Sequence, residues 1–331
     1  MKFTFLLFLY SAAAMAMSEQ TLLTEFPKTA LPYFQTRSVP QEFTASDGLH
    51  IKYYSFLVPG AKRVLVIAPG QGEPSIKYAE FIYDLKDLGV DIFIIDHRSQ
   101  GDSGRILTDI EKVHVNHFSD YTSDLAIFSS TVVHPESYEK SVLLGMSMGG
   151  AIVADFVRTH PTAYSSLVFL SPMFQVNSKN VSDELALKGL EAMEFEGFGT
   201  IYAPSQTAFD PHDPYPGNDV SSSTARFHIR RELLNLKPEY GSGGGTVHWA
   251  IESIKKTIEL QSAQKLLQVP TLVFQASADS VVVPEAEANV CQNNSRFCQL
   301  ISLKGAKHEL LMERDLFRDP ILKSIRRFLL Q

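Results

Sequence analysis

Residues 141–150 read Ser-Val-Leu-Leu-Gly-Met-Ser-Met-Gly-Gly, and a run suited to a helix follows from 151 to 158. The central five residues, Gly145-Met146-Ser147-Met148-Gly149, have the pattern G-x-S-x-G, in which a serine stands on a sharp turn between a strand and a helix. Side chains next to such a serine would clash, so the glycines leave the Ser147 hydroxyl exposed. The stretch therefore predicts a nucleophilic serine. Because glycine and serine are common residues, the pattern also arises by chance, and the alternative is a glycine-rich turn that caps a helix.

Apolar segments with strand character alternate with helical segments on both sides of this turn. Strands are predicted at 63–68, 91–95, 141–144, 166–170, 270–275 and 299–303, and helices at 75–88, 119–132, 151–158, 284–290 and 319–330. This alternation predicts a parallel sheet covered by helices, which is an α/β fold. Nearer the start, Ser46-Asp47-Gly48 separates the strand-like runs 41–45 and 49–57 and predicts a β-hairpin.

The order of a serine nucleophile, an acid and a histidine along the chain limits the candidates for the other two roles. Five of the ten histidines follow Ser147, and among them only His308 also follows the last predicted strand. Asp279 comes directly after the preceding strand, with Glu285 and Glu287 as the alternative acids. A neutral imidazole can take the proton of a serine, and a carboxylate fixes the tautomer of that imidazole. We therefore expect a catalytic triad of Ser147, Asp279 and His308. The alternatives are a surface-loop histidine and an aspartate that only forms a turn.

A glycine-rich loop follows the strand predicted at 63–68. Gly70 and Gly72 match part of a dinucleotide-binding loop, but the third glycine of that fingerprint is replaced by Ser75, which excludes it. The better interpretation is a loop that directs a backbone N–H at a developing oxyanion. We expect the two oxyanion donors to be the amides of Gln71 and Met148.

A polar loop at 96–105 follows the strand predicted at 91–95. Such a loop could bind a phosphate group, but we favour a structural role in which Asp96 and Arg98 hydrogen-bond to neighbouring loops. His308 also begins a zinc-protease-like motif, H-E-x-x-H, but Met312 stands in place of its second histidine. We therefore expect no metal site.

The alternation of strands and helices breaks between 173 and 268, where turn-forming residues are frequent. We interpret this segment as a cap inserted over the active edge of the sheet, with a helical part at 223–236. The predicted organisation is a first core part at 17–172, the cap at 173–268 and a second core part at 269–331. Most cap aromatics should form the core of the cap, and some should line an apolar cleft. The aromatic residues of this segment include Phe195, Phe198, Tyr202, Phe209 and Tyr215.

Residues 1–16 have the pattern of a secretory signal peptide. Lys2 supplies the positive charge, residues 3–10 are mostly apolar, and Ala14-Met15-Ala16 is a small-x-small cleavage site. The apolar run is short for a membrane span. We expect cleavage near Ala16 and a secreted or periplasmic protein, and the alternative is an uncleaved anchor.

The cysteine content and the net charge indicate a possible disulfide and limit the kinds of partner that the protein can bind. The two cysteines of the chain, Cys291 and Cys298, flank a short turn. In an exported protein this spacing suggests one disulfide, with two free thiols as the alternative. The net charge is −7 and no long basic run occurs, which argues against nucleic acid as a partner.

Several of these segments resemble the α/β-hydrolase family of bacterial lysophospholipases and monoacylglycerol lipases. The matching segments are 145–150, 96–98, 100–105 and 305–311 in the core, and 218–227 and 244–249 in the cap. The cap segments carry most weight, because the core motifs are shared by hydrolases with many different substrates.

The resemblance implies an α/β-hydrolase fold: a mostly parallel sheet with helices on both faces and an inserted cap. It also implies a serine hydrolase that cleaves fatty-acyl carboxylic esters through an acyl-enzyme, without a metal or organic cofactor. A lysophospholipid is the expected substrate, with monoacylglycerol or a general carboxylic ester as the alternative, and the cap could make peripheral contact with a membrane. A serine peptidase and a non-enzymatic binding protein on the same scaffold are the less favoured interpretations.

Overall fold

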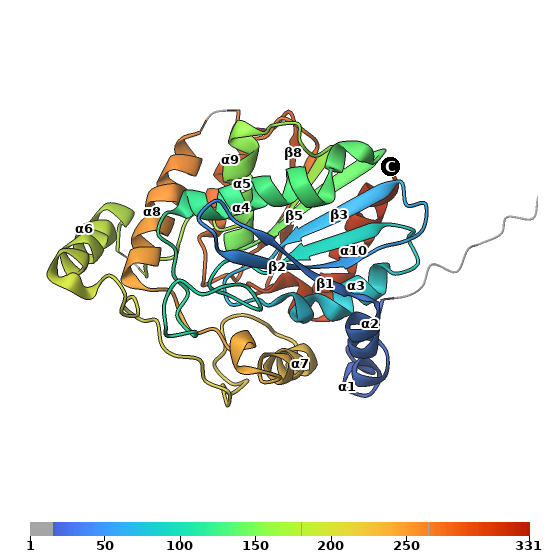
Figure 1. Cartoon of the computed structure of the whole chain (residues 1–331), viewed down its shortest axis with the longest axis horizontal. Coiled ribbons are helices and arrows are strands. Elements are labelled where there is room, and N and C mark those ends of the chain that lie inside the picture. Colours follow the sequence, from blue (N-terminus) through green and yellow to red (C-terminus); the bar gives the residue numbers. More distant parts are fainter. Residues whose placement is uncertain (1–15, 180, 264) are drawn as a thin grey trace, which may run out of the picture.

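The computed structural model describes residues 16–179, 181–263 and 265–331 of the chain. The described residues are built around one central sheet (Figure 1). It has eight strands in the order β1-β2-β4-β3-β5-β6-β7-β8. The bounds of the strands are β1 Val39–Thr44, β2 His50–Phe56, β3 Arg63–Ala68, β4 Asp91–Ile95, β5 Lys140–Met146, β6 Ser166–Leu170, β7 Thr271–Ala276 and β8 Cys298–Leu303.

The pairing of the strands confirms a mostly parallel sheet. β3 pairs in parallel with β4 and β5, and parallel pairing continues from β5 through β6 and β7 to β8. β1 and β2 form the predicted hairpin, and β2 also pairs antiparallel with β4. The carboxyl ends of the parallel strands therefore meet at one edge of the sheet, where the loops after them can build a site.

The helices connect these strands. Their bounds are α1 Leu22–Glu25, α2 Ala30–Arg37, α3 Ala79–Leu85, α4 Phe118–Phe128, α5 Met148–Thr159, α6 Asp183–Met193, α7 Thr224–Leu234, α8 Val247–Ser262, α9 Pro284–Asn293 and α10 Asp315–Leu330. The helix predicted at 75–88 is a 3₁₀ turn, Ser75–Tyr78, followed by α3. The helix predicted at 119–132 is α4, which continues into a π-helical turn, Ser129–Val133.

Helices cover both faces of the sheet, and β5 shows how the sequence directs this. Successive side chains of a strand point to opposite faces. Leu143 packs in the hydrophobic core that contains residues of α4, α5, α8 and α9, whereas Val142 and Leu144 pack in the core that contains residues of α3 and α10. All three side chains are fully buried. A strand that is buried on both faces needs a continuous apolar run, which is the pattern found here.

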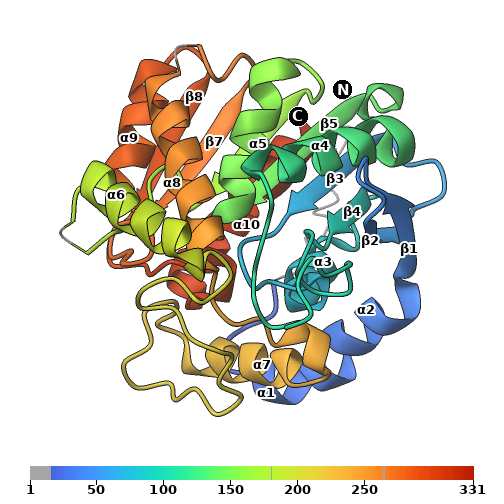
Figure 2. The same cartoon turned by 60° about the vertical axis from the view of Figure 1, so that its left-hand side comes forward.

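The segment between β6 and β7 leaves the sheet and forms a cap, whose predicted bounds, 173–268, stay a prediction. The helical part predicted at 223–236 corresponds to α7, but α6 and α8 are additional helices that we did not expect. Val247, Ile251 and Ile254 recur at helical spacing along α8 and pack against Leu190 of α6. α8 also packs against α5, so that one end of the cap joins the helical layer of the core (Figure 2).

Residues 17–38 form an extension that precedes β1 and packs on the domain. Leu22, Phe26 and Phe34 are buried and join the core on the α3 side of the sheet. α1 lies beside α7 in both views (Figures 1 and 2). The predicted signal peptide lies outside the described residues except for Ala16, so its cleavage stays a prediction. Among the described residues, no helix combines the length and the apolar character that crossing a membrane requires.

The structure contains the predicted disulfide between Cys291 and Cys298. It joins the last turns of α9 to the first residue of β8. The loop that carries His308 follows β8 directly, so the disulfide fixes the start of the strand that leads to this histidine.

Candidate active site

Ser147 lies between the end of β5 and the start of α5 in a strained backbone conformation. Its φ is 49° and its ψ is −118°, which residues other than glycine rarely adopt. The Ser147 N–H donates to the Leu170 carbonyl at 3.0 Å, and the Ser147 carbonyl accepts from the Gly150 N–H at 2.8 Å. A Cβ at Gly149 would lie 2.0 Å from the carbonyl oxygen of Ala68, so only glycine fits there. The motif therefore requires glycine at position 149 because α5 lies so close to β3.

The loops after β7 and β8 bring an acid and a histidine to this serine. Ser147 Oγ lies 2.8 Å from His308 Nε2, and His308 Nδ1 lies 2.6 Å from Asp279 Oδ2. With its proton on Nδ1, the imidazole donates to Asp279 and accepts the hydroxyl hydrogen bond of Ser147. Asp279 Oδ1 in turn accepts from the N–H groups of Val281 and Val282. The structure thus places the three residues of the predicted triad in hydrogen-bond contact, an arrangement that can activate a serine hydroxyl.

His308 is hydrogen-bonded to Asp279 and not to either of the alternative acids. Glu285 is exposed at the start of α9, whereas Glu287 is fully buried and its carboxyl oxygens make no hydrogen bond to any described residue. Burial raises the pKa of Glu287 well above its ordinary value, and the negative charge of Asp279 adds to this effect. Burial and the neighbouring Asp279 therefore both favour the protonated, neutral form of Glu287.

Two of the three amides in the turn after β3 are occupied. The Gly70 N–H donates to Glu73 Oε2 at 2.7 Å, and the Gly72 N–H donates to Gln100 Oε1 at 2.6 Å. The N–H of Gln71, between them, has no acceptor among the described residues. The turn thus keeps one amide available, and it is the amide that the sequence predicts as an oxyanion donor.

Met148, the second predicted oxyanion donor, is the first residue of α5. The N–H groups in the first turn of a helix have no partner within the helix, and they carry the positive end of its dipole. Gln71 and Met148 line the same cavity as Ser147 and His308. Both predicted donors therefore lie at the site, and their role in catalysis stays a prediction.

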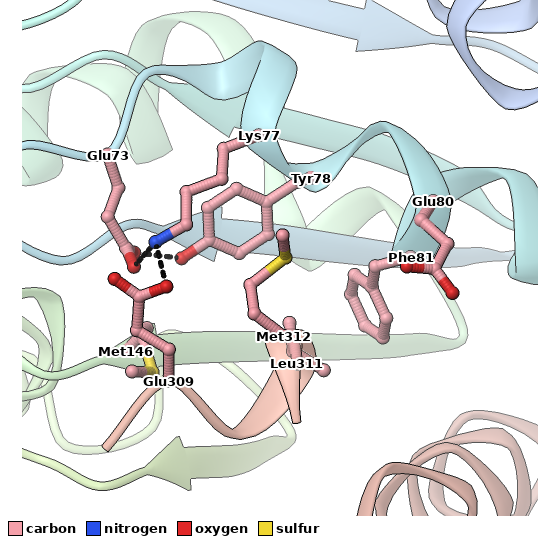
Figure 3. Close-up of a pocket in the computed structure, with 9 residues that line it drawn as sticks. All are labelled: Glu73, Lys77, Tyr78, Glu80, Phe81, Met146, Glu309, Leu311 and Met312. Carbon is pink, nitrogen blue, oxygen red and sulfur yellow. Dashed lines mark hydrogen bonds and ion pairs between the residues drawn. The ribbon is translucent and has the colours of Figure 1, made fainter. Parts of the chain in front are cut away.

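A buried network of charged side chains connects the turn after β3 to the histidine loop (Figure 3). Lys77 Nζ lies 2.5 Å from Glu73 Oε1 and 2.9 Å from Glu309 Oε2. The Tyr78 hydroxyl donates to Glu73 Oε2 at 2.6 Å. On the cap side, Arg230 Nε donates to Glu309 Oε1 at 3.1 Å. We call these five residues the loop-bridging network, and none of them was predicted from the sequence to be functional.

The loop-bridging network controls the charge beside the catalytic base. Burial alone would raise the pKa of Glu309, but the cations Arg230 and Lys77 outweigh this effect and hold the pKa at about 2. Glu309 follows His308 directly in the chain, and Lys77 joins it to the carboxylate that anchors Gly70. The network therefore fixes the position of the oxyanion turn relative to the histidine.

The polar loop at 96–105 has the structural role that we predicted. Asp96 Oδ1 accepts from the N–H of Ser75 at 2.7 Å. Arg98 is fully buried and donates through Nε and Nη2 to the carboxylate of Asp124 at 2.7 and 2.8 Å. Because these charged groups pair inside the protein, they are not available to a phosphate ligand.

The triad opens onto a cavity of about 350 Å³ that lies between the sheet edge and the cap. Arg230 of α7 and Trp249 of α8 contribute to its lining. One aromatic of the cap, Trp249, lines this cavity, as expected for some of the cap aromatics, whereas the five named in the sequence analysis do not line it and Phe195 is 89% exposed. Trp249 provides the aromatic wall instead, because α8 packs against the core and directs its first turn toward the site.

Two further hollows adjoin the catalytic cavity. An apolar groove of about 390 Å³ between α6 and α8 shares Val176 and Trp249 with it. A polar hollow of about 460 Å³ on the α7 side shares Gln71 and Arg230 with it. The serine therefore lies between an apolar space and a polar space.

Known proteins with similar sequences identify the family. A family profile described as "Serine aminopeptidase, S33" (Hydrolase_4) matches residues 59–315. Lysophospholipase L2 of Escherichia coli strain K12 is 34% identical over 298 residues, which cover 86% of this chain and 85% of that protein. The chain belongs to the S33 family of α/β-hydrolases.

Other members of the α/β-hydrolases show the same relationship at lower similarity. Monoglyceride lipase of Mus musculus is 25% identical over 305 residues, which cover 90% of this hydrolase and 94% of the mouse protein. The crystal structure of a thermostable carboxyl esterase from Bacillus coagulans has a TM-score of 0.71 at 17% identity and covers 88% of this chain and 98% of its own. The structural likeness confirms the α/β-hydrolase fold predicted from the sequence.

The loop-bridging network should be necessary for efficient catalysis. Glu73→Gln keeps an acceptor for Gly70 but removes the charge that faces Lys77, and unpaired buried charges are costly. We expect kcat on p-nitrophenyl esters to fall about tenfold or more, with KM changed less, because the turn loses its fixed position. Glu139→Gln, which breaks an exposed ion pair with Lys62, is the matched control and should change neither parameter. Unchanged kcat in a folded Glu73→Gln variant would contradict a positioning role.

The buried acid Glu287 should make stability depend on pH. Its pKa is raised from an ordinary value of 4.5, so above that pH the folded state keeps a proton that the unfolded state releases. The free energy of unfolding therefore loses a contribution as the pH rises above 4.5. Glu287→Gln removes this dependence, so the stability of the variant relative to the wild type should increase between pH 5 and pH 8 in urea unfolding. The same relative stability at both pH values would contradict a neutral buried acid.

Proposed function

We propose that this α/β-hydrolase is a lysophospholipase that releases a fatty acid from a single-chain phospholipid through an acyl-enzyme. The observation that carries the proposal is the position of Ser147, between the apolar groove and the polar hollow that contains Arg230. A lysophospholipid has its ester bond at the junction of an acyl chain and a phosphate-bearing head group. Its two halves therefore match the two spaces on either side of the serine.

The reaction follows from the geometry of the triad. Ser147 attacks the ester carbonyl while His308 takes its proton, and Asp279 stabilises the resulting imidazolium. The amides of Gln71 and Met148 bind the oxyanion, and such donors lower the barrier by about 3–4 kcal/mol each. His308 then protonates the leaving alcohol, which is the glycerophospho group of a lysophospholipid. A water molecule that is deprotonated by His308 cleaves the acyl-enzyme and releases the fatty acid.

The apolar groove supports an acyl chain as one part of the substrate. Leu190 and Met193 of α6 and Ile254 of α8 line it, and Trp249 connects it to the catalytic cavity. Burial of each CH₂ group contributes roughly 0.8 kcal/mol to binding. The groove therefore favours long-chain esters over short-chain esters.

Arg230 supports an anionic head group as the other part. Its Nε donates to Glu309, whereas Nη1 and Nη2 make no hydrogen bond to any described residue. The side chain is 20% exposed, and it lines the catalytic cavity. A guanidinium with two available nitrogens can bind a phosphate through two parallel hydrogen bonds. Monoacylglycerol has no such anion, so Arg230 favours a lysophospholipid over this alternative.

We further propose that the protein is exported to a secreted or periplasmic location after cleavage of residues 1–16. The charged start, the apolar run and the small residues of this segment support the proposal. The disulfide between Cys291 and Cys298 also supports it, because disulfides persist mainly in oxidising compartments.

The cap provides a surface that we propose for peripheral contact with the membrane that holds the substrate. Leu185 of α6 is 62% exposed, and Phe195 and Phe198 in the turn after α6 are 89% and 49% exposed. Leu185 also lines the apolar groove, so this exposed side chain adjoins the proposed path of the acyl chain. Apolar side chains that gather at the mouth of such a groove are typical of lipid contact sites.

The first test compares fatty acid release from palmitoyl lysophosphatidylcholine and from monopalmitoylglycerol. The wild type should hydrolyse the phospholipid with the higher kcat/KM. Ser147→Ala should lower kcat by about 10⁴-fold or more on both substrates, because the nucleophile is lost. A faster rate on monopalmitoylglycerol would favour the monoacylglycerol lipase alternative, and no turnover of either lipid would reject both functions.

Arg230→Gln should separate the two substrates. We expect kcat/KM for the phospholipid to fall about tenfold or more, which is typical for a lost hydrogen bond to a charged group. The value for monopalmitoylglycerol should fall less, because with this substrate only the contact of Arg230 with Glu309 is lost. Arg231→Gln is the matched control, because Arg231 lines the polar hollow but not the catalytic cavity. Equal losses on both substrates would show that Arg230 supports the site without binding the head group.

The proposed membrane contact predicts that substitutions in this surface slow the hydrolysis of lipid in vesicles but not the hydrolysis of a soluble ester. Leu185→Ser combined with Phe195→Ser should weaken binding to phosphatidylcholine vesicles in a flotation assay and slow hydrolysis of lysophospholipid within them. Hydrolysis of soluble p-nitrophenyl butyrate should be unchanged. Leu316→Ser is the control, because Leu316 is 68% exposed on α10, outside the cap. Vesicle binding that is unaffected by the double substitution would reject this surface.

A further inference from the structure

A buried cluster of charged side chains lies where α3, α7 and α10 meet. Arg226 Nη2 lies 2.9 Å from Glu80 Oε1 and 2.7 Å from Asp315 Oδ1. Arg318 Nη1 lies 2.8 Å from Asp84 Oδ2 and 3.3 Å from Glu80 Oε1. Both arginines are fully buried, as are the carboxylates of Glu80 and Asp84 apart from a few per cent of their surface. We call these five residues the N-terminal charge cluster.

The main chain that follows the predicted cleavage site binds directly to this cluster. The Met17 N–H donates to Asp84 Oδ1 at 3.0 Å, and the Met17 carbonyl accepts from Arg226 Nη2 at 3.2 Å. Two residues later, the Glu19 N–H donates to Asp315 Oδ2 at 2.8 Å. The cluster thus holds the backbone nitrogen of Met17 against a carboxylate.

The cluster has an excess of negative charge. Its three carboxylates face two guanidinium groups. Around it, Arg326 donates to the backbone carbonyl of Asp84, whereas Asp319 and Glu19 add two carboxylates. The Glu19 carboxylate accepts from the Ser223 hydroxyl and so has a neutral partner there. When these outer groups are included, the carboxylates still outnumber the guanidinium groups. An uncompensated negative charge at such a buried site is costly.

We infer that the N-terminal charge cluster is the binding site for the ammonium group that forms when the chain is cleaved between Ala16 and Met17. The inference rests on the proposed export and on a signal peptidase of the host. Water adds across the Ala16–Met17 peptide bond, so that Ala16 leaves with a new carboxylate and the Met17 nitrogen gains a hydrogen. At neutral pH this amine takes up a further proton. The nitrogen that donates to Asp84 as an amide then carries the positive charge that the cluster lacks.

The chemistry of an amine gives this pair a characteristic pH dependence. A free α-amino group has a pKa of about 7.7–8.0, and the pairing with Asp84 should raise that pKa in the folded state. The stability that results is fully present below the unfolded pKa and is lost as the pH rises through the folded pKa. The ammonium should therefore stabilise the mature protein at pH 7 and contribute nothing at about pH 10.5.

The first experiment locates the new N-terminus. The full chain is expressed in a bacterial host that secretes it to the periplasm, and the N-terminus of the purified protein is sequenced. We expect Met17 as the first residue. Absence of cleavage would overturn the inference together with the proposed signal peptide, and cleavage at another bond would overturn the assignment of Met17 alone.

The second experiment compares two purified chains that differ by one residue. The mature chain begins at Met17, and the comparison chain begins at Ala16 and so keeps an amide at Met17. At pH 7 the mature chain should unfold at a temperature about 2–4 °C higher, as expected for a single buried ion pair in a protein of this size. The difference should disappear at pH 10.5.

Asp84→Asn, introduced into both chains, completes a double-mutant cycle. The substitution also weakens the contact with Arg318 and should lower both unfolding temperatures, but the difference between the two chains should be lost. A difference that persists in the Asp84→Asn pair, or equal unfolding temperatures of the two original chains at pH 7, would overturn the inference. Because none of these measurements uses the enzymatic activity, their outcome is independent of the proposed substrate.

Discussion

The close approach of α5 to β3 is the constraint on which the rest of the site depends. The carbonyl oxygen of Ala68 occupies the space that a side chain at position 149 would need, so only glycine fits at the second position of the helix. This contact imposes a strained backbone on Ser147 and directs its hydroxyl away from the sheet. β7 and β8 lie further along the same sheet, and the loops at their carboxyl ends then bring Asp279 and His308 to a serine whose position is already fixed.

Three acids near His308 have the same chemistry but different environments. Asp279 accepts two backbone N–H groups and the imidazole N–H, so its position is fixed and it can orient the base. Glu287 lacks such partners among the described residues, and burial favours its neutral form. Glu309 is also buried, but Lys77 and Arg230 hold it in its charged form. The charge around the base is therefore set by the neighbours of each acid, which come from the sheet, from the turn after β3 and from the cap.

The elements that could be predicted from the sequence are those that depend on local pattern. Apolar runs located the parallel strands, and the order of residues along the chain selected the triad, because each signal is contained in a short segment. Glu73, Lys77 and Arg230 could not be found in this way, since they gain a role only when distant segments meet. The cap was the least predictable part: α6 and α8 are stabilised by packing against each other and the core. The aromatic residues of the cap also did not show which side chains point toward the cleft and which point toward solvent. Phe195, for example, is 89% exposed.

The docking of the N-terminal segment also has a consequence for the timing of synthesis. Glu19 binds Asp315, which lies 296 residues further along the chain. At the usual rate of translation, about 5–20 residues per second, roughly 15 seconds or more separate the appearance of these two residues. The N-terminal segment therefore has no docking site until α10 has left the ribosome. During that interval this part of the docking site is absent, so under the proposed export the recognition and cleavage of the signal precede the final closure of the fold.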